Sequence, residues 1–321
     1  MNQGFPRLLG DIGGTNARWA WQASSGAELE DISIQPCGAS ASLELSAKAY
    51  LNSHGRPQPL WAGIGVATAI TGDEVRMTNN DWRFSISAFQ QSLGLERCLV
   101  VNDFTSLALS LPALKATDLR AIGGGVAVSD RSFALIGPGT GLGVSGLIAD
   151  GKGHFTALSG EGGHVTLAAS DDGEAALLGA LRSAFDHVSA ERVLSGQGLV
   201  NLYHAVCTVE GVAPQALGPV DVTNAAIAKT DAHCVAAVEY FTRFLGNVAG
   251  NLTLTLGALG GLYIGGGIVP RLGLAFDEVL FRQQFEAKGR YQAMLQDVPV
   301  WLITASTPAL LGASRALDVL P

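Results

Sequence analysis

Residues 7–22 have the sequence RLLGDIGGTNARWAWQ, and this stretch decides the fold. Two apolar runs, 7–12 and 17–22, flank the pair Gly13-Gly14, which is typical of two strands joined by a tight turn. A similar arrangement recurs at 133–149, FALIGPGTGLGVSGLIA. Because each copy opens a longer series of strands and helices, we predict an α/β protein made of two related lobes.

The first half of the chain continues with the expected order βββαβαβα. Further strands are expected at 29–35, 61–68 and 97–101. Helices are expected from about Ser42 to Ser53, from the N-cap Ser85 to Gly94, and from near Phe104.

The second half follows the same plan. Strands are expected at 154–158, 262–264 and 300–304, and a final helix at 308–319. We expect this helix to return to the first lobe, which gives a small α/β lobe at 1–112 with 305–321, and a large α/β lobe at 113–304. One large α/β domain is the alternative. A central cleft between two lobes is a natural ligand site.

The composition excludes several classes of protein. Of the 321 residues, 48% are hydrophobic and 15% are charged, so the chain is not disordered. Glycine contributes 41 residues, about twice its usual share, and without a Gly-X-Y repeat these glycines serve turns and close backbone contacts. A net charge of −8 without runs of Lys or Arg disfavours nucleic acid and anionic membranes as partners.

The cysteines and the N-terminus point to a cytoplasmic protein. Cys37, Cys98, Cys207 and Cys234 form no CxxC pair, which favours reduced thiols over a zinc site or a disulfide framework. We expect no signal peptide, because the N-terminal residues lack an apolar region followed by a cleavage site.

Residues 252–269, LTLTLGALGGLYIGGGIV, are long enough to be a candidate membrane span. Glycines at 257, 261 and 265 have the spacing of a helix-packing face. Three successive glycines at 265–267 would interrupt such a helix, however. A buried helix to about residue 256, a glycine turn and a short buried strand explain the stretch better, and no membrane partner is expected.

Several catalytic motifs are absent. GxGxxG fails because Val144 stands where its third glycine belongs. A P-loop fails because Gly153 follows Lys152 in place of Ser or Thr, and the DGKG sequence is typical of a hairpin turn. No GxSxG or HExxH occurs. A nicotinamide dehydrogenase, a P-loop NTPase and an α/β-hydrolase are therefore disfavoured.

Three glycine-rich turns remain, at 11–16 (DIGGTN), 137–143 (GPGTGLG) and 265–271 (GGGIVPR). Main-chain N–H groups at such turns can bind phosphates without Lys or Arg. Thr15 and Thr140 add hydroxyl donors, and Asp11 can hold Mg²⁺ directly or through water. Each turn alone could merely connect strands, but two of the three lie at matching places in the repeat, which favours phosphate binding.

Polar side chains follow probable strands or lie near helix starts. These candidates are Asn102, Asp103, Glu161, His164 and Glu191. Amides, carboxylates and imidazole match the donors and acceptors of a polyhydroxylated ligand. Structural alternatives remain for three of them: Asp103 as a cap of the following helix, Glu191 as a solvated residue early in a helix, and His164 as a hydrogen-bonded core histidine.

The chain resembles the bacterial glucokinase family, in order and over almost its whole length. The motifs that carry the resemblance are DIGGTNAR (11–18), ITGD (70–73), MTN (77–79) with Trp82, NDF (102–104), GTGLGV (139–144), GEGGHV (160–165), HVSAERVLSG (187–196) and GGIVPR (266–271). The resemblance implies two ribonuclease-H-like lobes of the actin-like ATPase superfamily with a central cleft. The sequence departs from the family pattern at three positions where proline is expected: Ala69, Ser159 and Gln197. These departures put the rigidity of the local loops in doubt, not the chemistry.

The resemblance also implies roles for individual residues. ATP phosphates would bind at Gly10, Asp11, Ile12, Gly13, Gly14 and Thr15, with Asp11 near Mg²⁺, and at Gly139, Thr140 and Gly141. Adenosine would approach Gly265, Gly266 and Gly267. Glucose would bind to Asn102, Asp103, Glu161, His164 and Glu191, with Asp103 as the catalytic base.

The implied activity is ATP-dependent phosphorylation of glucose at O6, feeding glycolysis, in a homodimer. No structural zinc is expected, because no cysteine lies between Cys98 and Cys207. A kinase for another hexose, such as mannose or an N-acetylhexosamine, is the main alternative. A non-catalytic sugar sensor is the other, and we expect no DNA-binding segment before the first glycine strand.

Overall fold

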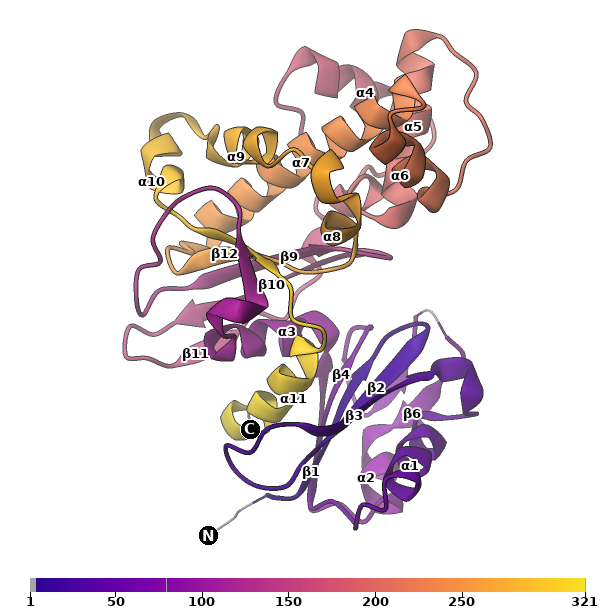
Figure 1. Ribbon diagram of the computed structural model, residues 1–321, viewed down its shortest axis with the longest axis vertical. Helices are drawn as coiled ribbons and strands as arrows, with labels where there is room; N and C mark the ends of the chain where they lie inside the picture. The colour runs from indigo at the N-terminus through magenta and orange to yellow at the C-terminus, as the bar shows by residue number, and fades with distance from the viewer. Residues whose placement is uncertain (1–3, 79, 321) are drawn as a thin grey trace. The chain divides into compact units, whose positions relative to one another are not determined.

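The computed structural model describes residues 4–78 and 80–320. The chain divides into two compact units, 1–115 with 305–321, and 116–304. The sequence-based boundary at 112/113 lies a few residues before this division. Each unit is built around one sheet (Figure 1).

The sheet of the first unit has five strands in the order β3-β2-β1-β4-β7. Their bounds are Arg7–Ile12 (β1), Asn16–Gln22 (β2), Glu30–Pro36 (β3), Trp61–Val66 (β4) and Arg97–Asn102 (β7). β1, β2 and β3 are antiparallel neighbours, whereas β4 is parallel to both β1 and β7. The predicted hairpin at 7–22 is confirmed.

Helices cover both faces of this sheet. Successive residues of β1 point to opposite faces, so neighbouring β1 side chains pack against different helices. The helices are Leu43–Ser53 (α1), Ile86–Ser92 (α2), Asp103–Ser110 (α3) and Pro308–Val319 (α11), with short 3-10 turns at Cys37–Ala39 (η1) and Leu111–Ala113 (η2). Leu8 belongs to the core cluster that contains Trp19 and α1 residues. Leu9 packs with Leu310 and Leu317 of α11 on the other face.

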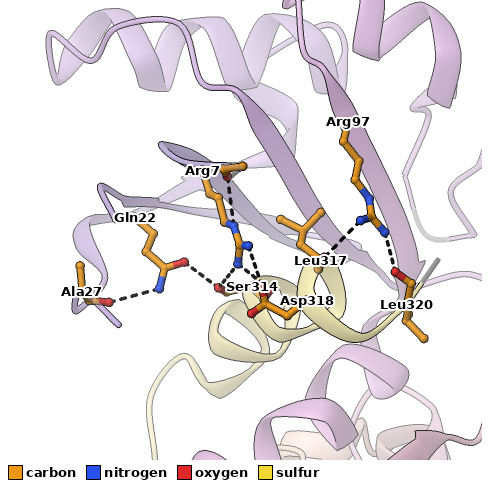
Figure 2. Close-up of polar contacts among 9 residues, drawn as sticks. Arg7, Gln22, Ala27, Arg97, Ser314, Leu317, Asp318 and Leu320 are labelled. Atoms are coloured by element: carbon orange, nitrogen blue, oxygen red, sulfur yellow. Dashed lines mark hydrogen bonds and ion pairs between the residues drawn. The ribbon is translucent and has the colours of Figure 1, made fainter. Parts of the chain in front are cut away.

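The last helix returns to the first unit, as the sequence predicts. Figure 2 shows how its polar contacts hold it there. The buried Arg7 guanidinium donates to the Ser314 carbonyl at 3.1 Å and forms an ion pair with Asp318 at 2.6 Å. Arg97 donates to the carbonyls of Leu317 and Leu320 near the end of the helix. Both arginines thus satisfy main-chain groups of α11 at its C-terminal half.

Glycines allow α11 to pack directly on main-chain atoms. A Cβ at Gly312 would overlap the Ser106 carbonyl of α3, and one at Gly63 of β4 would overlap the Ala313 carbonyl. The Ser106 hydroxyl donates to the Ala309 carbonyl at 2.8 Å. The position of α3 on the sheet is therefore set by backbone contact with α11.

The second unit repeats the sheet topology of the first, with one added strand, in the order β11-β10-β9-β12-β13-β8. The bounds are Leu119–Ala121 (β8), Phe133–Pro138 (β9), Leu142–Ala149 (β10), Phe155–Ala157 (β11), Gly261–Ile264 (β12) and Val300–Ile303 (β13). Again the first three strands of the repeat are antiparallel neighbours and the next two are parallel. The predicted repeat is present in strand order and direction.

Helices make up most of the rest of the second unit. They are Asp172–Arg182 (α4), Gly196–Glu210 (α5), Pro219–Ala228 (α6), Ala232–Leu256 (α7), Ile268–Leu272 (α8), Glu278–Glu286 (α9) and Gln292–Gln296 (α10). Short 3-10 turns lie at Ala116–Asp118 (η3), Gly162–His164 (η4), Ala190–Arg192 (η5), Gly273–Ala275 (η6) and Gly289–Tyr291 (η7). Phe241, Phe244 and Leu245 of α7 are fully buried in the core.

The interpretation of 252–269 as a membrane span is wrong. α7 ends at Leu256 because Gly257 adopts a left-handed conformation with φ +57°, and β12 follows. No helix within residues 4–78 and 80–320 is long and apolar enough to cross a membrane.

Three short strands are missing from the predicted element order. β5 (Glu74–Arg76) and β6 (Arg83–Ser85) form an antiparallel hairpin between β4 and α2, and β8 pairs with the outer side of β13. Each has only three residues, too few for an alternating pattern to be recognised by itself, whereas β11, equally short, lies within the predicted strand 154–158.

We predict that Gly312→Ala destabilises the protein by about 1–3 kcal/mol, because the added methyl group meets the Ser106 carbonyl, which cannot rotate away. The measurement is urea unfolding followed by tryptophan fluorescence. Gly179→Ala in α4 is the matched control, since its Cβ would enter open space. That control is expected to stabilise by about 0.5–1 kcal/mol through helix propensity. Equal effects of the two substitutions would contradict the close-contact explanation.

Candidate functional site

The first glycine turn joins β1 to β2. It is closed by the Gly13 N–H, which donates to the Asn16 carbonyl at 2.9 Å, and Thr15 is exposed beside it. Gly10 and Ile12 lie inside the unit instead: Ile12 is fully buried, and a Cβ at Gly10 would press on the Trp19 ring. These two residues can offer a ligand only main-chain atoms.

Asp11 lies near the end of β1, directly opposite Arg18 of β2. Its carboxylate pairs with the Arg18 guanidinium at 3.2 Å, and the Asp11 side chain is only 15% exposed. Burial raises the pKa of Asp11 above its ordinary value, and Arg18 opposes that shift only in part. Asp11 is therefore an acidic group held in a site that disfavours its charged form.

The second and third glycine turns lie side by side in the second unit. The β9–β10 turn is closed by the Gly139 N–H, which donates to the Gly141 carbonyl at 2.8 Å. β12 runs parallel to β9, and after it the Gly265 N–H donates to the Ile136 carbonyl at 2.8 Å. Gly266, at φ +77°, packs where a Cβ would overlap the Pro138 carbonyl. The two turns thus meet at the carboxyl ends of parallel strands.

Both turns have exposed main chain. A Cβ at Gly267 would meet no atom within 4 Å, and one at Gly139 would find its nearest neighbour 3.9 Å away. The Gly196 N–H at the start of α5 donates to the Gly139 carbonyl at 2.9 Å. The positive end of a 15-residue helix therefore adjoins the second turn, which suits an anionic ligand.

Glu191 connects the second turn to the GEGGH segment. One of its carboxylate oxygens accepts from the Leu142 N–H at 2.8 Å, and the other lies 3.9 Å from His164 Nε2. A Cβ at Gly141 would overlap this carboxylate. The interpretation of Glu191 as a solvated helix residue is wrong, because it lies on the short turn η5 and its carboxylate is bonded to β10.

Glu161 directly precedes η4 and His164 is its last residue, and this short turn packs tightly on β10. A Cβ at Gly162 would press on Val144, and one at Gly163 would overlap the Leu142 carbonyl. The His164 side chain is 58% exposed, so it is not a core histidine. Glu161 is exposed, and its carbonyl accepts from the His164 N–H at 3.0 Å. The second unit thus brings His164 and Glu191 together, with Glu161 on the same short turn.

Asn102 and Asp103 lie at the junction of β7 and α3 in the first unit. The Asn102 side chain is the N-cap: its oxygen accepts from the N–H groups of Phe104 and Thr105 at 2.9 and 3.2 Å. Its amide nitrogen donates to the Thr68 carbonyl at 3.4 Å. The structural alternative of Asp103 as the helix cap is wrong, because the N-cap is Asn102. Asp103 is the first helical residue, where the dipole of α3 favours a negative charge.

Sequence reasoning missed residues that hold the first turn. Arg18 could have been found, because it lies opposite Asp11 in a hairpin whose register the turn sets. Cys37 and Asn80 both donate to the Gly13 carbonyl from distant segments, and no local pattern predicts that. Of the MTN motif, Asn79 lies outside the described residues.

We predict that Asp11→Asn becomes more stable relative to the wild type as pH rises. A raised folded-state pKa gives stability that is fully present below the unfolded-state value of 3.8 and is lost as pH rises through the folded-state value. Asparagine cannot ionise, so the variant escapes this loss. The measurement is the difference in unfolding free energy between variant and wild type from pH 3.8 to neutral.

Asp150→Asn is the control with the opposite sign. The hydrogen bond from His154 lowers the pKa of the exposed Asp150, so its contribution is present above the unfolded-state value and is lost as pH falls. This variant should lose stability relative to the wild type as pH rises from below 3.8 through that value, so its unfolding free energy is measured at lower pH as well. The same trend in both variants would refute the assignment for Asp11.

Comparisons with known proteins agree over nearly the whole chain. The family model described as Glucokinase matches residues 8–319. A protein named glucokinase from Aromatoleum aromaticum is 51% identical over 98% of this chain and 95% of its own length. A crystal structure of glucokinase from an Antarctic psychrotroph is 37% identical, with a TM-score of 0.91 and coverage of 98% and 99% of the two chains. A ROK family glucokinase from Streptomyces griseus, solved with glucose and AMPPNP, shares the fold at 18% identity and a TM-score of 0.64, with coverage of 96% and 97%.

Proposed function

This chain belongs to the glucokinase family and is an ATP-dependent glucose kinase, and we propose that it transfers the γ-phosphoryl group of ATP to O6 of D-glucose, giving glucose 6-phosphate and ADP. The observation that carries the proposal is the Glu191 carboxylate, which contacts both a glycine turn suited to phosphates and His164. The Glu191 carboxylate therefore contacts one group proposed to bind ATP phosphates and one group proposed to bind glucose.

We propose that the end of β1 with the first glycine turn, together with the second glycine turn, contacts the ATP phosphates. The residues are Gly10, Asp11, Ile12, Gly13, Gly14 and Thr15 of the first turn and Gly139, Thr140 and Gly141 of the second. Gly265, Gly266 and Gly267 lie beside the second turn and are proposed to contact adenosine. The Gly13 and Gly139 N–H groups already donate to the Asn16 and Gly141 carbonyls, so the N–H groups proposed to reach the phosphates are those of Gly14, Thr15, Thr140 and Gly141.

Asp11 is the residue proposed to hold Mg²⁺. Magnesium in kinases is commonly held by one or two carboxylates together with substrate phosphates, so the single Asp11 carboxylate fits it. When bound, Mg²⁺ would neutralise charge on the phosphate oxygens. The role of Arg18 is to orient the Asp11 carboxylate through their ion pair.

We propose that glucose is bound by Asn102, Asp103, Glu161, His164 and Glu191. Carboxylates accept from sugar hydroxyls, while amide and imidazole groups can donate to them or accept. His164 Nε2 lies 3.9 Å from the Glu191 carboxylate, which supports a shared role because both side chains can reach the same sugar. A sugar lacking one hydroxyl would leave one of these groups unpaired, which is the basis of selectivity.

Asp103 is proposed as the catalytic base. Its Oδ1 accepts from the Phe104 N–H at 2.9 Å, and this bond at the start of α3 orients the carboxylate. In the proposed step, Asp103 takes the proton of the 6-hydroxyl while O6 attacks the γ-phosphorus in line. The glycine-turn N–H groups stabilise the charge on the transferred phosphoryl group.

The shared strand order of the two sheets supports a finer assignment of the fold as two ribonuclease-H-like units of the actin-like ATPase type. We further propose a cytoplasmic homodimer that feeds glycolysis, on the strength of family membership.

The test is an assay that couples ADP formation to a spectroscopic signal, with glucose, mannose and N-acetylglucosamine compared at equal concentration. The expected result is the highest kcat/KM for glucose. A higher value for another hexose would instead favour the alternative of a kinase for that sugar. Sugar binding by calorimetry without any transfer would favour a non-catalytic sensor.

We predict that Asp103→Ala lowers kcat by about 10²–10⁴-fold, the usual contribution of a general base. Glucose binding, measured by calorimetry, should be partly retained because the other sugar ligands remain. Asp172→Ala is the matched control, since Asp172 is the first residue of α4 as Asp103 is of α3. Unchanged turnover in Asp103→Ala would rule out the assignment.

A further inference from the structure

The carbonyl of Gly13 in the first glycine turn is held by two side chains. The Cys37 thiol donates to it at 3.5 Å and the Asn80 amide nitrogen at 3.3 Å. Cys37 lies on η1, directly after β3, whereas Asn80 lies in the connection between β5 and β6. Two segments far apart in the sequence therefore meet at one peptide group.

Asn80 is fixed at both ends of its side-chain amide. Its oxygen accepts from the Trp82 N–H at 2.9 Å, which leaves the nitrogen directed to Gly13. Trp82 is buried, and its indole nitrogen donates to the Ser40 carbonyl at 3.0 Å. Hydrogen bonds thus link the β5–β6 connection to the segment that follows η1.

Cys37 is fixed by its own backbone. Its N–H donates to the Thr15 carbonyl at 2.8 Å, and the residue is 3% exposed. Burial raises the pKa of the Cys37 thiol, so the thiol keeps its proton at neutral pH and remains a donor. One residue therefore donates to two carbonyls of the turn.

These bonds determine which way the turn's peptide groups face. The carbonyl and N–H of one trans peptide point in opposite directions, so a Gly13 carbonyl directed at Cys37 and Asn80 turns the Gly14 N–H away from them. The carbonyls of Thr15 and Asn16 also accept internal donors, from Cys37 and Gly13. A phosphate is attracted by N–H groups and repelled by carbonyl oxygens. Because glycine rotates freely about φ and ψ, the sequence of the turn alone does not enforce this orientation.

We propose that Cys37 and Asn80 are positioning residues that hold the Gly13–Gly14 peptide with its N–H directed at the phosphates of ATP. The proposal rests on the proposed function, in which this turn binds ATP. Neither residue touches the substrate, and both act through the Gly13 carbonyl.

The experiment compares steady-state kinetics of Cys37→Ala, Cys37→Ser and Asn80→Ala with the wild type, varying ATP and glucose separately. Loss of one donor is expected to raise KM for ATP roughly three- to tenfold, the effect of one hydrogen bond, with KM for glucose unchanged. Cys37→Ser keeps a donor and should restore KM for ATP to near the wild-type value. Calorimetry with AMPPNP alone should show the same order of affinities.

Cys98→Ala is the matched control, because Cys98 lies near the start of β7, in register with Ala62 of β4 and through it with Leu8 of β1, whereas the turn follows the end of β1. It should leave both KM values unchanged. Thermal unfolding of every variant measures any purely structural effect.

The outcomes separate the inference from the function on which it rests. Variants that unfold at lower temperature but keep the wild-type KM for ATP would overturn the positioning role and leave glucose kinase activity intact. A rise in KM for glucose equal to that for ATP would also overturn it. A wild-type protein without ATP-dependent glucose phosphorylation would overturn the proposed function and the inference with it.

Discussion

Direct contact between main chains, at positions where any Cβ would collide, is the constraint on which both units depend. Gly312 brings α11 onto the Ser106 carbonyl, and Gly163 brings the GEGGH segment onto the Leu142 carbonyl. Gly266, which follows β12, likewise allows direct contact with the Pro138 carbonyl at the end of β9. This close packing accounts for much of the excess of glycine in the sequence, and it leaves little freedom for the segments that carry polar side chains.

The candidate site inherits its geometry from these contacts. α3 starts at Asp103, and it can approach β4 closely because Gly65 presents no side chain to it. Glu191 reaches the Leu142 N–H because Gly141 leaves room for its carboxylate. The site also carries a cost in stability, since burial raises the pKa of Asp11 and disfavours its ionised form. The proposal that Asp11 holds Mg²⁺ gives a functional reason for an acidic group at that position.

The sequence predicted the elements with strong local patterns. The hairpin at 7–22, its repeat at 133–149, the end of α7 at Gly257 and the return of α11 were all predicted, because apolar periodicity and glycine turns are local signals. The short strands β5, β6 and β8 lacked such a signal and were missed. The site residues could be named from motifs, but their partners could not, because the bond between Glu191 and β10 depends on the tertiary fold.

Glycine residues alone are not sufficient for a turn to bind phosphate. The absence of side chains that lets a phosphate approach also lets each peptide rotate, so the carbonyls must be held by groups outside the turn. The first turn obtains these donors from Cys37 and Asn80. The second uses a different one, since the Gly139 carbonyl accepts from the Gly196 N–H at the start of α5. Both units therefore have a glycine turn at the same place, but different groups donate hydrogen bonds to its carbonyls. These donors have to be identified in the structure of each unit separately.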